Sequence, residues 1–387
     1  MSATTATETE PHEDRGAFVP LARELGAQFA GAAAAHDREG SFVSEAYDVL
    51  REAGYLALAV PTELGGLGAT IAQVAMAQVE MSKHCASTSL AVSMHHHITL
   101  FAAWRHRREM PGAEGLLRRI ADDRIVLVST GGSDFTRPNG TAEKVDGGYR
   151  LNGRKIFCSQ VPAGDVFSTL FTFDDPERGR RVLAMAVPVK ADGVEVLDTW
   201  DTLGMRATGS HDVQMTDVFA GDAQVASDRP WGVIDPPLII IASHAMPVIA
   251  GAYLGVAEAA RDHAVAALVG KPRADDPLVQ RQVGLMDNKL QVARWALLGA
   301  LDVIGPDPAP DVHSFAAAMT AKRCVAEEGI AVCDLAMEVA GGSGFYRRNP
   351  IEQCYRDIRA AKFHPLTPEQ TLLHAGRVAL GLPADEM

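Results

Sequence analysis

The apolar positions in the first hundred residues recur at the spacing of an α-helix. Leu21, Leu25 and Phe29 follow one another at four-residue intervals, which places their side chains on one helix face. A glycine-rich loop, VPTELGGLGAT, interrupts this pattern, and Thr70 then opens a TIAQ capping box that signals the start of a long helix. The pattern therefore predicts an N-terminal helical domain over residues 18–123.

At Arg124 the hydrophobic period changes to two, the period of a β-strand. The segments VDGGY (Val145–Tyr149) and LNGR (Leu151–Arg154) predict two hairpin turns in quick succession. Short strands without intervening helices are typical of an antiparallel barrel or sandwich, so a central β domain is expected over residues 124–226. Further strands are predicted at Val166–Phe173, Arg181–Val189, Val194–Leu197 and Val213–Phe219.

Helical spacing returns near Pro237, and Ala-rich runs predict a C-terminal four-helix bundle over residues 236–387. The first segment, Pro236–Val256, approaches the length of a membrane span, but His244 and Pro247 interrupt it and no basic flank follows. We expect a buried core helix here and no membrane span. The fold class is α+β, with three domains in the order helical, β, helical.

Composition and charge exclude several classes of function. The formal net charge of −13 disfavours nucleic acid and anionic membrane surfaces as partners. The five cysteines show no CxxC pair and no zinc-like spacing, so reduced thiols of a cytoplasmic protein are expected. Residues 1–17 lack the basic and apolar segments of a signal peptide, and their Thr/Glu content predicts a disordered lead-in.

Four sequence segments resemble motifs of the acyl-CoA dehydrogenase family and occur in the same order. They are GYLALAVPTELGGLGAT, STGGSDFTRPNGTAEKVDGGYRLNGRKIFCS, DTLGMRATGSHDVQMTDVFA and AGGSGFYRRNPIEQCYRDIRAAK. The resemblance runs from about residue 18 to the C-terminus. It implies an FAD-dependent homodimer or homotetramer, with FMN as the alternative cofactor, that acts on an acyl thioester or another small molecule and needs an electron acceptor or a flavin reductase.

The resemblance also implies which residues hold the flavin. Ser129, Thr130 and Ser133 match a strand motif that supplies backbone and hydroxyl donors to the ring and the pyrophosphate, where fixed donors stabilise the negative charge of a reduced flavin. Phe157 matches an aromatic residue that packs on the isoalloxazine, and Ser159 a hydroxyl that bonds its N5 atom. On a strand, residues two apart share one face, which suits a flat cofactor.

The GGSG run at the end of a predicted helix is not preceded by a strand, so it is not a dinucleotide fingerprint, and a helix C-cap explains it equally well. By resemblance, Gly341 and Gly342 would let the FAD pyrophosphate of a neighbouring subunit approach the backbone. Thr367 matches a family threonine close to the flavin.

The sequence departs from the family at the catalytic base. The family's usual glutamate lies nine residues after an Arg-Asp pair, where this chain has Pro365, and its other location corresponds to Ala245. Removing a proton from an acyl α-carbon needs a base within hydrogen-bond reach. His364 is the candidate catalytic residue, as general base or acid, and His244, beside Ala245, is a second candidate.

Three consecutive histidines stand on the long helix that lines the acyl pocket in the family. Successive helical side chains point about 100° apart, so these three cannot converge on one ion, and no metal site is expected. Because the resemblance places this helix beside the acyl pocket, His96 and His97 are candidates for the substrate pocket, and so is His244. A water-bonded histidine cluster is the simpler interpretation.

Three functions remain open. The first is an FAD-dependent oxidoreductase that removes hydrogens from the α and β carbons of an acyl-CoA or acyl-carrier thioester. The second is a flavin monooxygenase on the same scaffold that uses reduced flavin and O2; the missing glutamate and the histidines favour it. The third is a non-catalytic subunit that has lost turnover together with its base.

Overall fold

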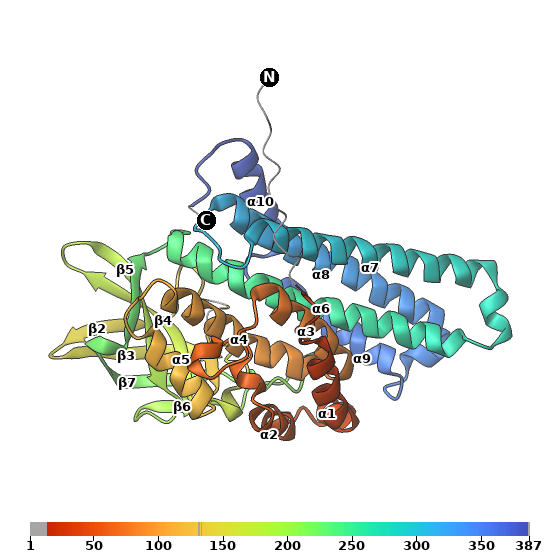
Figure 1. The fold of residues 1–387 in the computed structure, drawn as a ribbon, viewed down its shortest axis with the longest axis horizontal. Coiled ribbons are helices and arrows are strands. Elements are labelled where there is room, and N and C mark those ends of the chain that lie inside the picture. Colours follow the sequence, from red (N-terminus) through yellow and green to blue (C-terminus); the bar gives the residue numbers. More distant parts are fainter. Residues whose placement is uncertain (1–13, 131, 133, 386–387) are drawn as a thin grey trace.

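The computed structural model describes residues 14–385 except 131 and 133, so most of the predicted lead-in lies outside the described residues. The N-terminal part is helical (Figure 1). The capping box predicted at Thr70 is confirmed, because its hydroxyl accepts the N–H of Gln73 and the Gln73 side chain accepts the N–H of Thr70. The helices are α1 (Val19–Glu39), α2 (Ser44–Glu52), α3 (Ile71–His84), α4 (Ala86–His106) and α5 (Ala113–Asp122).

The central strands form one mixed, mostly antiparallel sheet in the order β6-β7-β3-β2-β4-β5-β8, with β1 paired to β4. Two pairings, β1 with β4 and β2 with β4, are parallel, so the expectation of a wholly antiparallel arrangement needs this correction. The strands are β1 (Leu127–Ser129), β2 (Thr141–Val145), β3 (Gly148–Lys155), β4 (Val166–Asp175), β5 (Gly179–Pro188), β6 (Val194–Val196), β7 (Val213–Gly221) and β8 (Val225–Pro230).

One of the two predicted hairpin turns is present. Residues 146 and 147 join β2 to β3, as the VDGGY segment predicts. The prediction of a second turn at Leu151–Arg154 is wrong, because this segment lies inside β3, where the register against β7 shifts between Leu151 and Gly153. Gly153 has φ of 149°, and a Cβ there would come within 2.5 Å of the Gly140 backbone. The glycine therefore serves a β-bulge with close backbone contact.

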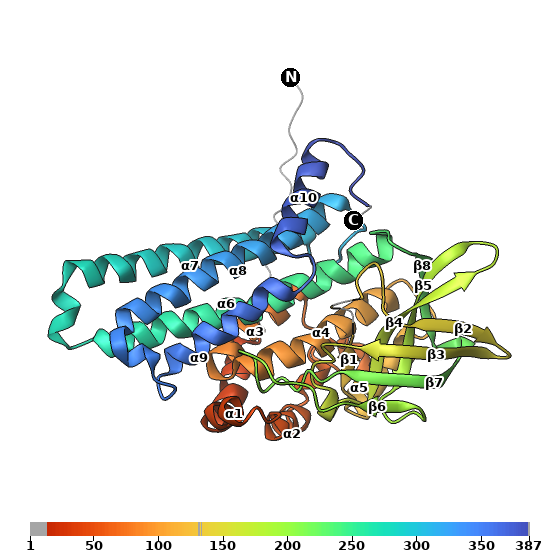
Figure 2. The ribbon, with the colours of Figure 1, turned by 180° about the vertical axis from the view of Figure 1, so that it is seen from behind.

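The C-terminal part is a bundle of long helices that extends away from the sheet (Figure 2). The predicted core helix at Pro236 is confirmed: α6 is long and apolar enough to cross a membrane, but its most apolar window is almost wholly buried. The helices are α6 (Pro236–Leu268), α7 (Pro277–Ile304), α8 (Val312–Ala340), α9 (Pro350–Asp357) and α10 (Pro368–Ala379).

The helices at the two ends of the chain share one hydrophobic core. Buried apolar side chains from α1 to α4 belong to the same cluster as those of α6, α7, α8 and the segment that follows α9. The approach is closest between α6 and α3, where a Cβ on Gly255 would lie 2.2 Å from the carbonyl oxygen of Val79. A second cluster fills the sheet, and a third joins α4 and α5 to β1. The sheet is thereby held against α4.

Candidate functional site

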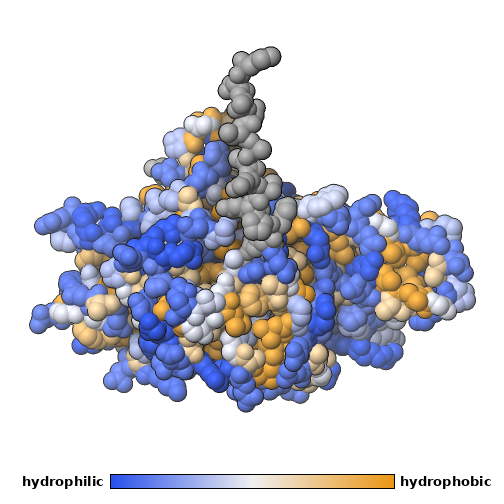
Figure 3. All heavy atoms as spheres, in the orientation of Figure 1, coloured by the Kyte–Doolittle hydropathy of each residue, from blue (hydrophilic) through white to orange (hydrophobic). Residues whose placement is uncertain are grey.

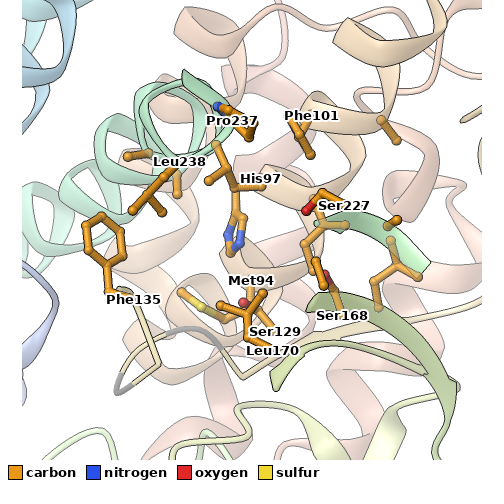
Figure 4. A pocket seen from close by; sticks show the side chains of 18 of the residues that line it. Met94, His97, Phe101, Ser129, Phe135, Ser168, Leu170, Ser227, Pro237 and Leu238 are labelled. Atoms are coloured by element: carbon orange, nitrogen blue, oxygen red, sulfur yellow. The ribbon is translucent and has the colours of Figure 1, made fainter. Parts of the chain in front are cut away.

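A cavity of about 200 Å³ lies between α4, α6 and the strands β1, β4, β5 and β8 (Figure 4). Most of its lining is apolar, as expected for a pocket that binds a small molecule and excludes water. The polar lining residues among those described are His97, Arg105, Ser129, Ser168, Ser227, Arg229 and His364.

Both positions at which the family carries its catalytic glutamate face this cavity. Ala245 on α6 and Pro365 after α9 are lining residues, and neither side chain can accept a proton. Within the part of the chain that the structure describes, no Asp or Glu lines the cavity. The cavity therefore has the place for the family's base but lacks the carboxylate.

His97 and His364 approach the cavity from two different elements. Figure 4 shows the His97 ring pointing into the space between Leu238 and Met94. The Nδ1 atom of His97 lies 3.1 Å from the carbonyl oxygen of Ser93, one turn earlier on α4, so it can donate there and leave Nε2 as an acceptor. Burial lowers the pKa of His97 to about 4. The imidazole is therefore neutral at pH 7.

His364 follows α9 and is held from two sides. Its Nε2 atom lies 2.8 Å from the Tyr253 hydroxyl of α6, and its carbonyl oxygen accepts a hydrogen bond from the Lys322 ammonium of α8. Burial, with smaller effects of Lys322 and His97, lowers the pKa of His364 to about 3. Burial also raises the pKa of Tyr253, so the phenol keeps its proton and can donate it to the His364 ring.

The three consecutive histidines have three different surroundings. His95 bridges two segments, because its Nε2 lies 2.7 Å from the Leu56 carbonyl oxygen and its Nδ1 accepts the N–H of Leu127 at 3.1 Å. His96 is fully buried, and neither of its ring nitrogens has a hydrogen-bond partner within the described part of the chain. His96 does not line the cavity, contrary to the expectation for it; of the three, His97 does. Which of these histidines faces the cavity depends on how other segments pack around α4, and the sequence alone does not give that packing.

His244 also lies outside the cavity lining. Its Nδ1 is 2.7 Å from the carbonyl oxygen of Ile240 in the same helix, and its ring packs edge-on against Phe101 at 6.3 Å. The neighbouring Ala245 faces the cavity instead. The substrate-pocket role predicted for His244 therefore does not match its position.

Phe157 and Ser159 follow β3 in a turn and do not lie on a strand as expected. β3 ends at Lys155, and Phe157 takes the left-handed conformation with φ of 56°, which is uncommon for a bulky residue. The Phe157 ring is 46% exposed and meets Trp200 edge-on at 6.0 Å. The Ser159 oxygen accepts from the Ser210 hydroxyl at 2.8 Å, which leaves its own O–H free to donate. An exposed aromatic face beside a hydroxyl donor fits a flat cofactor.

The other predicted flavin residues are dispersed. Ser129, at the end of β1, lines the cavity. The fully buried Thr130 donates its hydroxyl to Thr169 at 2.9 Å, inside the sheet. Thr367 caps α10, where its hydroxyl accepts the N–H of Gln370. Ser133 lies outside the described residues.

Gly341 and Gly342 are exposed at the C-terminal end of α8. The opposite end of this helix carries Phe315, which packs against the cavity residue Phe135. The 26 residues that separate Phe315 from Gly341 span about 39 Å of helix. These glycines therefore lie far along α8 from the cavity of their own subunit.

Sequence reasoning missed three residues around the cavity, namely Arg105, Tyr253 and Lys322. Arg105 has a sequence signal, because His97, Phe101 and Arg105 follow at four-residue spacing and all three line the cavity. Tyr253 and Lys322 have no such signal, since their contacts with His364 join residues 111 and 42 positions apart.

Comparison with known proteins identifies the family. Models of the acyl-CoA dehydrogenase N-terminal, middle and C-terminal domains match residues 12–108, 129–218 and 242–364. The chain belongs to the acyl-CoA dehydrogenase family and is a flavoenzyme-type oxidoreductase.

Individual relatives cover nearly the whole chain. A putative acyl-CoA dehydrogenase, YdbM of Bacillus subtilis, is 29% identical over 87% of this chain and 90% of its own length. L-evernosamine nitrososynthase of Micromonospora sp. is 32% identical over 91% of this chain and 87% of its own. The structure of KijD3 in complex with FMN and dTDP-3-amino-2,3,6-trideoxy-4-keto-3-methyl-D-glucose superimposes with a TM-score of 0.86 and 27% identity, covering 96% of this chain and 95% of that one.

Proposed function

We propose that this protein is a flavin-dependent monooxygenase that uses reduced flavin and O2. The observation that carries the proposal is the cavity itself, where Ala245 and Pro365 occupy the two base positions and the neutral His97 and His364 are lining residues that would supply the proton-exchanging groups. Dehydrogenation of an acyl thioester, the first hypothesis from the sequence, needs a base that these positions do not offer.

The comparisons support the same direction. The relatives named as nitrososynthases are as similar to this chain as the putative dehydrogenase, and the KijD3 complex contains FMN. We therefore favour FMN over FAD as the cofactor. Bound reduced flavin would supply the two electrons and two protons with which one atom of O2 is placed on the substrate and the other becomes water, and the flavin would be left oxidised.

The residues of this chain would divide the work as follows. The exposed Phe157 ring would stack on the flavin, and the Ser159 O–H would donate to it. His97 Nε2 would accept a proton in the cavity, and the apolar lining would exclude water from the reacting atoms. His364, aligned by Tyr253, would exchange a proton from the segment that follows α9.

A spectroscopic comparison tests the proposal. The purified protein is loaded with FMN or FAD, and the oxidised form is mixed anaerobically with octanoyl-CoA. We expect no bleaching of the flavin. The chemically reduced form is then mixed with O2 in a stopped-flow instrument, and reoxidation should depend on His97 when the His97→Phe variant is compared with His96→Phe. Rapid anaerobic bleaching by the acyl-CoA would overturn the proposal in favour of dehydrogenation.

We also propose that the chain forms a homodimer or homotetramer. Large apolar side chains are exposed on the bundle, among them Leu278 (72%), Trp295 (63%) and Phe345 (86%). Figure 3 shows hydrophobic surface toward the end of the bundle where α6 connects to α7. Large apolar side chains exposed on one part of a protein are typical of an interface, which supports the proposal. In such an assembly Gly341 and Gly342 could approach the cofactor of a neighbouring subunit, and light scattering would measure its size.

A further inference from the structure

Arg105, at one end of the cavity, is a cation with unused hydrogen-bonding capacity. Its Nη2 donates to the carbonyl oxygen of Pro111 at 2.9 Å, but its Nε atom is buried and has no hydrogen-bond partner among the residues that the structure describes. Across residues 14–385, leaving aside 131 and 133, no carboxylate forms an ion pair with Arg105, and burial alone lowers its pKa. Arg105 as a whole is only half-buried, but an Nε–H that is shielded from water without a partner costs free energy, which a ligand that accepts its hydrogen bond would recover.

The other arginine of the cavity does not share this property. Arg229 donates to the carbonyl oxygens of Phe135 and Val233, and the Asp235 carboxylate lies 4.0 Å away. Its hydrogen bonds therefore hold the loop before β2 and the start of α6 in place. The contrast identifies Arg105, and not Arg229, as the group that can receive an anion.

The position of Arg105 on α4 also sets the distance between the anion site and His97. His97, Phe101 and Arg105 are spaced four residues apart and all line the cavity, so they form one stripe along the helix. Eight residues separate His97 from Arg105, which corresponds to about 12 Å along the helix axis. Phe101 lies between them, and the surrounding lining from α6 and β5 is apolar.

We propose that the substrate is an amphipathic anion. Its carboxylate or phosphate would pair with Arg105, its apolar body would lie beside Phe101, and its oxidisable atom would reach His97 and His364. The claim that the far end of the substrate is oxidised near His97 rests on the proposed function. The claim that Arg105 binds an anion rests only on the geometry of Arg105. A charge-assisted hydrogen bond in such a setting favours the anion over a neutral analogue by about tenfold or more.

Calorimetric binding to the full-length protein tests this without any turnover. The probes are n-octanoate, octyl phosphate and the neutral octanamide. The native protein should bind at least one anion about tenfold more tightly than octanamide. Arg105→Gln should remove this preference, whereas Arg118→Gln, at an exposed arginine of α5 paired with Glu114, should preserve it. Phe101→Leu should weaken all probes alike.

The outcomes separate cleanly. Preference for octanoate identifies a carboxylate, and preference for octyl phosphate identifies a phosphate. Equal binding of anion and amide by the native protein, or a preference that persists in Arg105→Gln with an unchanged melting temperature, overturns the proposal. If Arg105→Gln melts early, Arg105→Lys is used, which keeps the charge and should keep part of the preference. Because no probe is oxidised, failure of the monooxygenase proposal leaves this result readable.

Discussion

Replacing each of the three consecutive histidines of α4 by phenylalanine should give three different results. The substitution is the same in each case and removes two ring nitrogens while keeping a planar ring. The ring of His95 makes hydrogen bonds to Leu56 and Leu127, the ring of His96 makes none to any described residue, and His97 faces the cavity. The differences between the variants therefore isolate what each imidazole contributes.

The structure sets the expected magnitudes. His95→Phe leaves the buried carbonyl of Leu56 and the N–H of Leu127 without a partner, which should lower the free energy of unfolding by about 2–5 kcal/mol. His96→Phe removes two buried unpartnered nitrogens, and the free energy of unfolding should stay constant or rise by about 1 kcal/mol. His97→Phe should cost about 1 kcal/mol in stability but slow the reaction by roughly 10²–10⁴-fold, as expected for loss of a proton acceptor.

Two measurements on the same preparations check this. Urea unfolding followed by circular dichroism gives the stability, and stopped-flow reoxidation of bound reduced FMN by O2 gives the rate. The His96→Phe protein is the control for the rate, since its mutated ring lies outside the cavity. The reasoning is refuted if His96→Phe is the least stable variant, or if His96→Phe and His97→Phe reoxidise at the same rate.

Three further outcomes are expected. Because burial lowers the pKa of His95, His97 and His244 to about 4, the unfolded chain alone takes up these protons below the ordinary value of 6.5. The stabilisation by these neutral histidines should therefore be fully present above about pH 6.5 and be lost toward about pH 4. The raised pKa of Asp357, about 7, has the opposite effect, but it is one group against three, so the free energy of unfolding should fall with the pH; thermal melts across this range measure it. Gly255→Ala should destabilise by about 2 kcal/mol or more in urea unfolding, because its Cβ would overlap the Val79 carbonyl of α3, whereas Gly284→Ala on α7, with open space, should not. The Lys322 ammonium holds the carbonyl oxygens of His364 and Leu366, which follow α9. Lys322→Met should release them, slow turnover and alter the pH profile of turnover, while flavin affinity stays unchanged. An unaltered pH profile would contradict a positioning role for Lys322.

Local patterns in the sequence were sufficient to predict the order of the elements. The capping box at Thr70, the VDGGY turn and the apolar run of α6 are encoded in neighbouring residues, and all three are present. The LNGR segment has the composition of a turn, but a contact between Gly153 and Gly140 makes it a bulge. β8 was missed because it pairs with β5, more than forty residues away, and has no alternating pattern of its own.

Residues of the candidate site could be predicted only where they belong to a sequence motif of the family or recur at helical spacing. The sequence indicated that Pro365 and Ala245 cannot act as bases, and the structure adds that both face the same cavity. It could not separate His96 from His97, because their surroundings come from other segments, as the contact of His96 with Tyr55 illustrates. The local sequence also gave no sign of the turn that carries Phe157, where φ is positive and the next residue, Cys158, donates its N–H to the distant carbonyl oxygen of His211.

The shared core of the first and last helices has a consequence for synthesis of the protein. One wall of the cavity is α4, and another is the segment of His364, which lies much later in the chain and is therefore synthesised after α4. The early helices keep a large apolar face exposed until α6 and α8 cover it, so the nascent chain is a natural client for chaperones that shield such surfaces. The cavity is thus complete only once the segment of His364 has been made, and premature termination after α8 would leave the cavity open on that side.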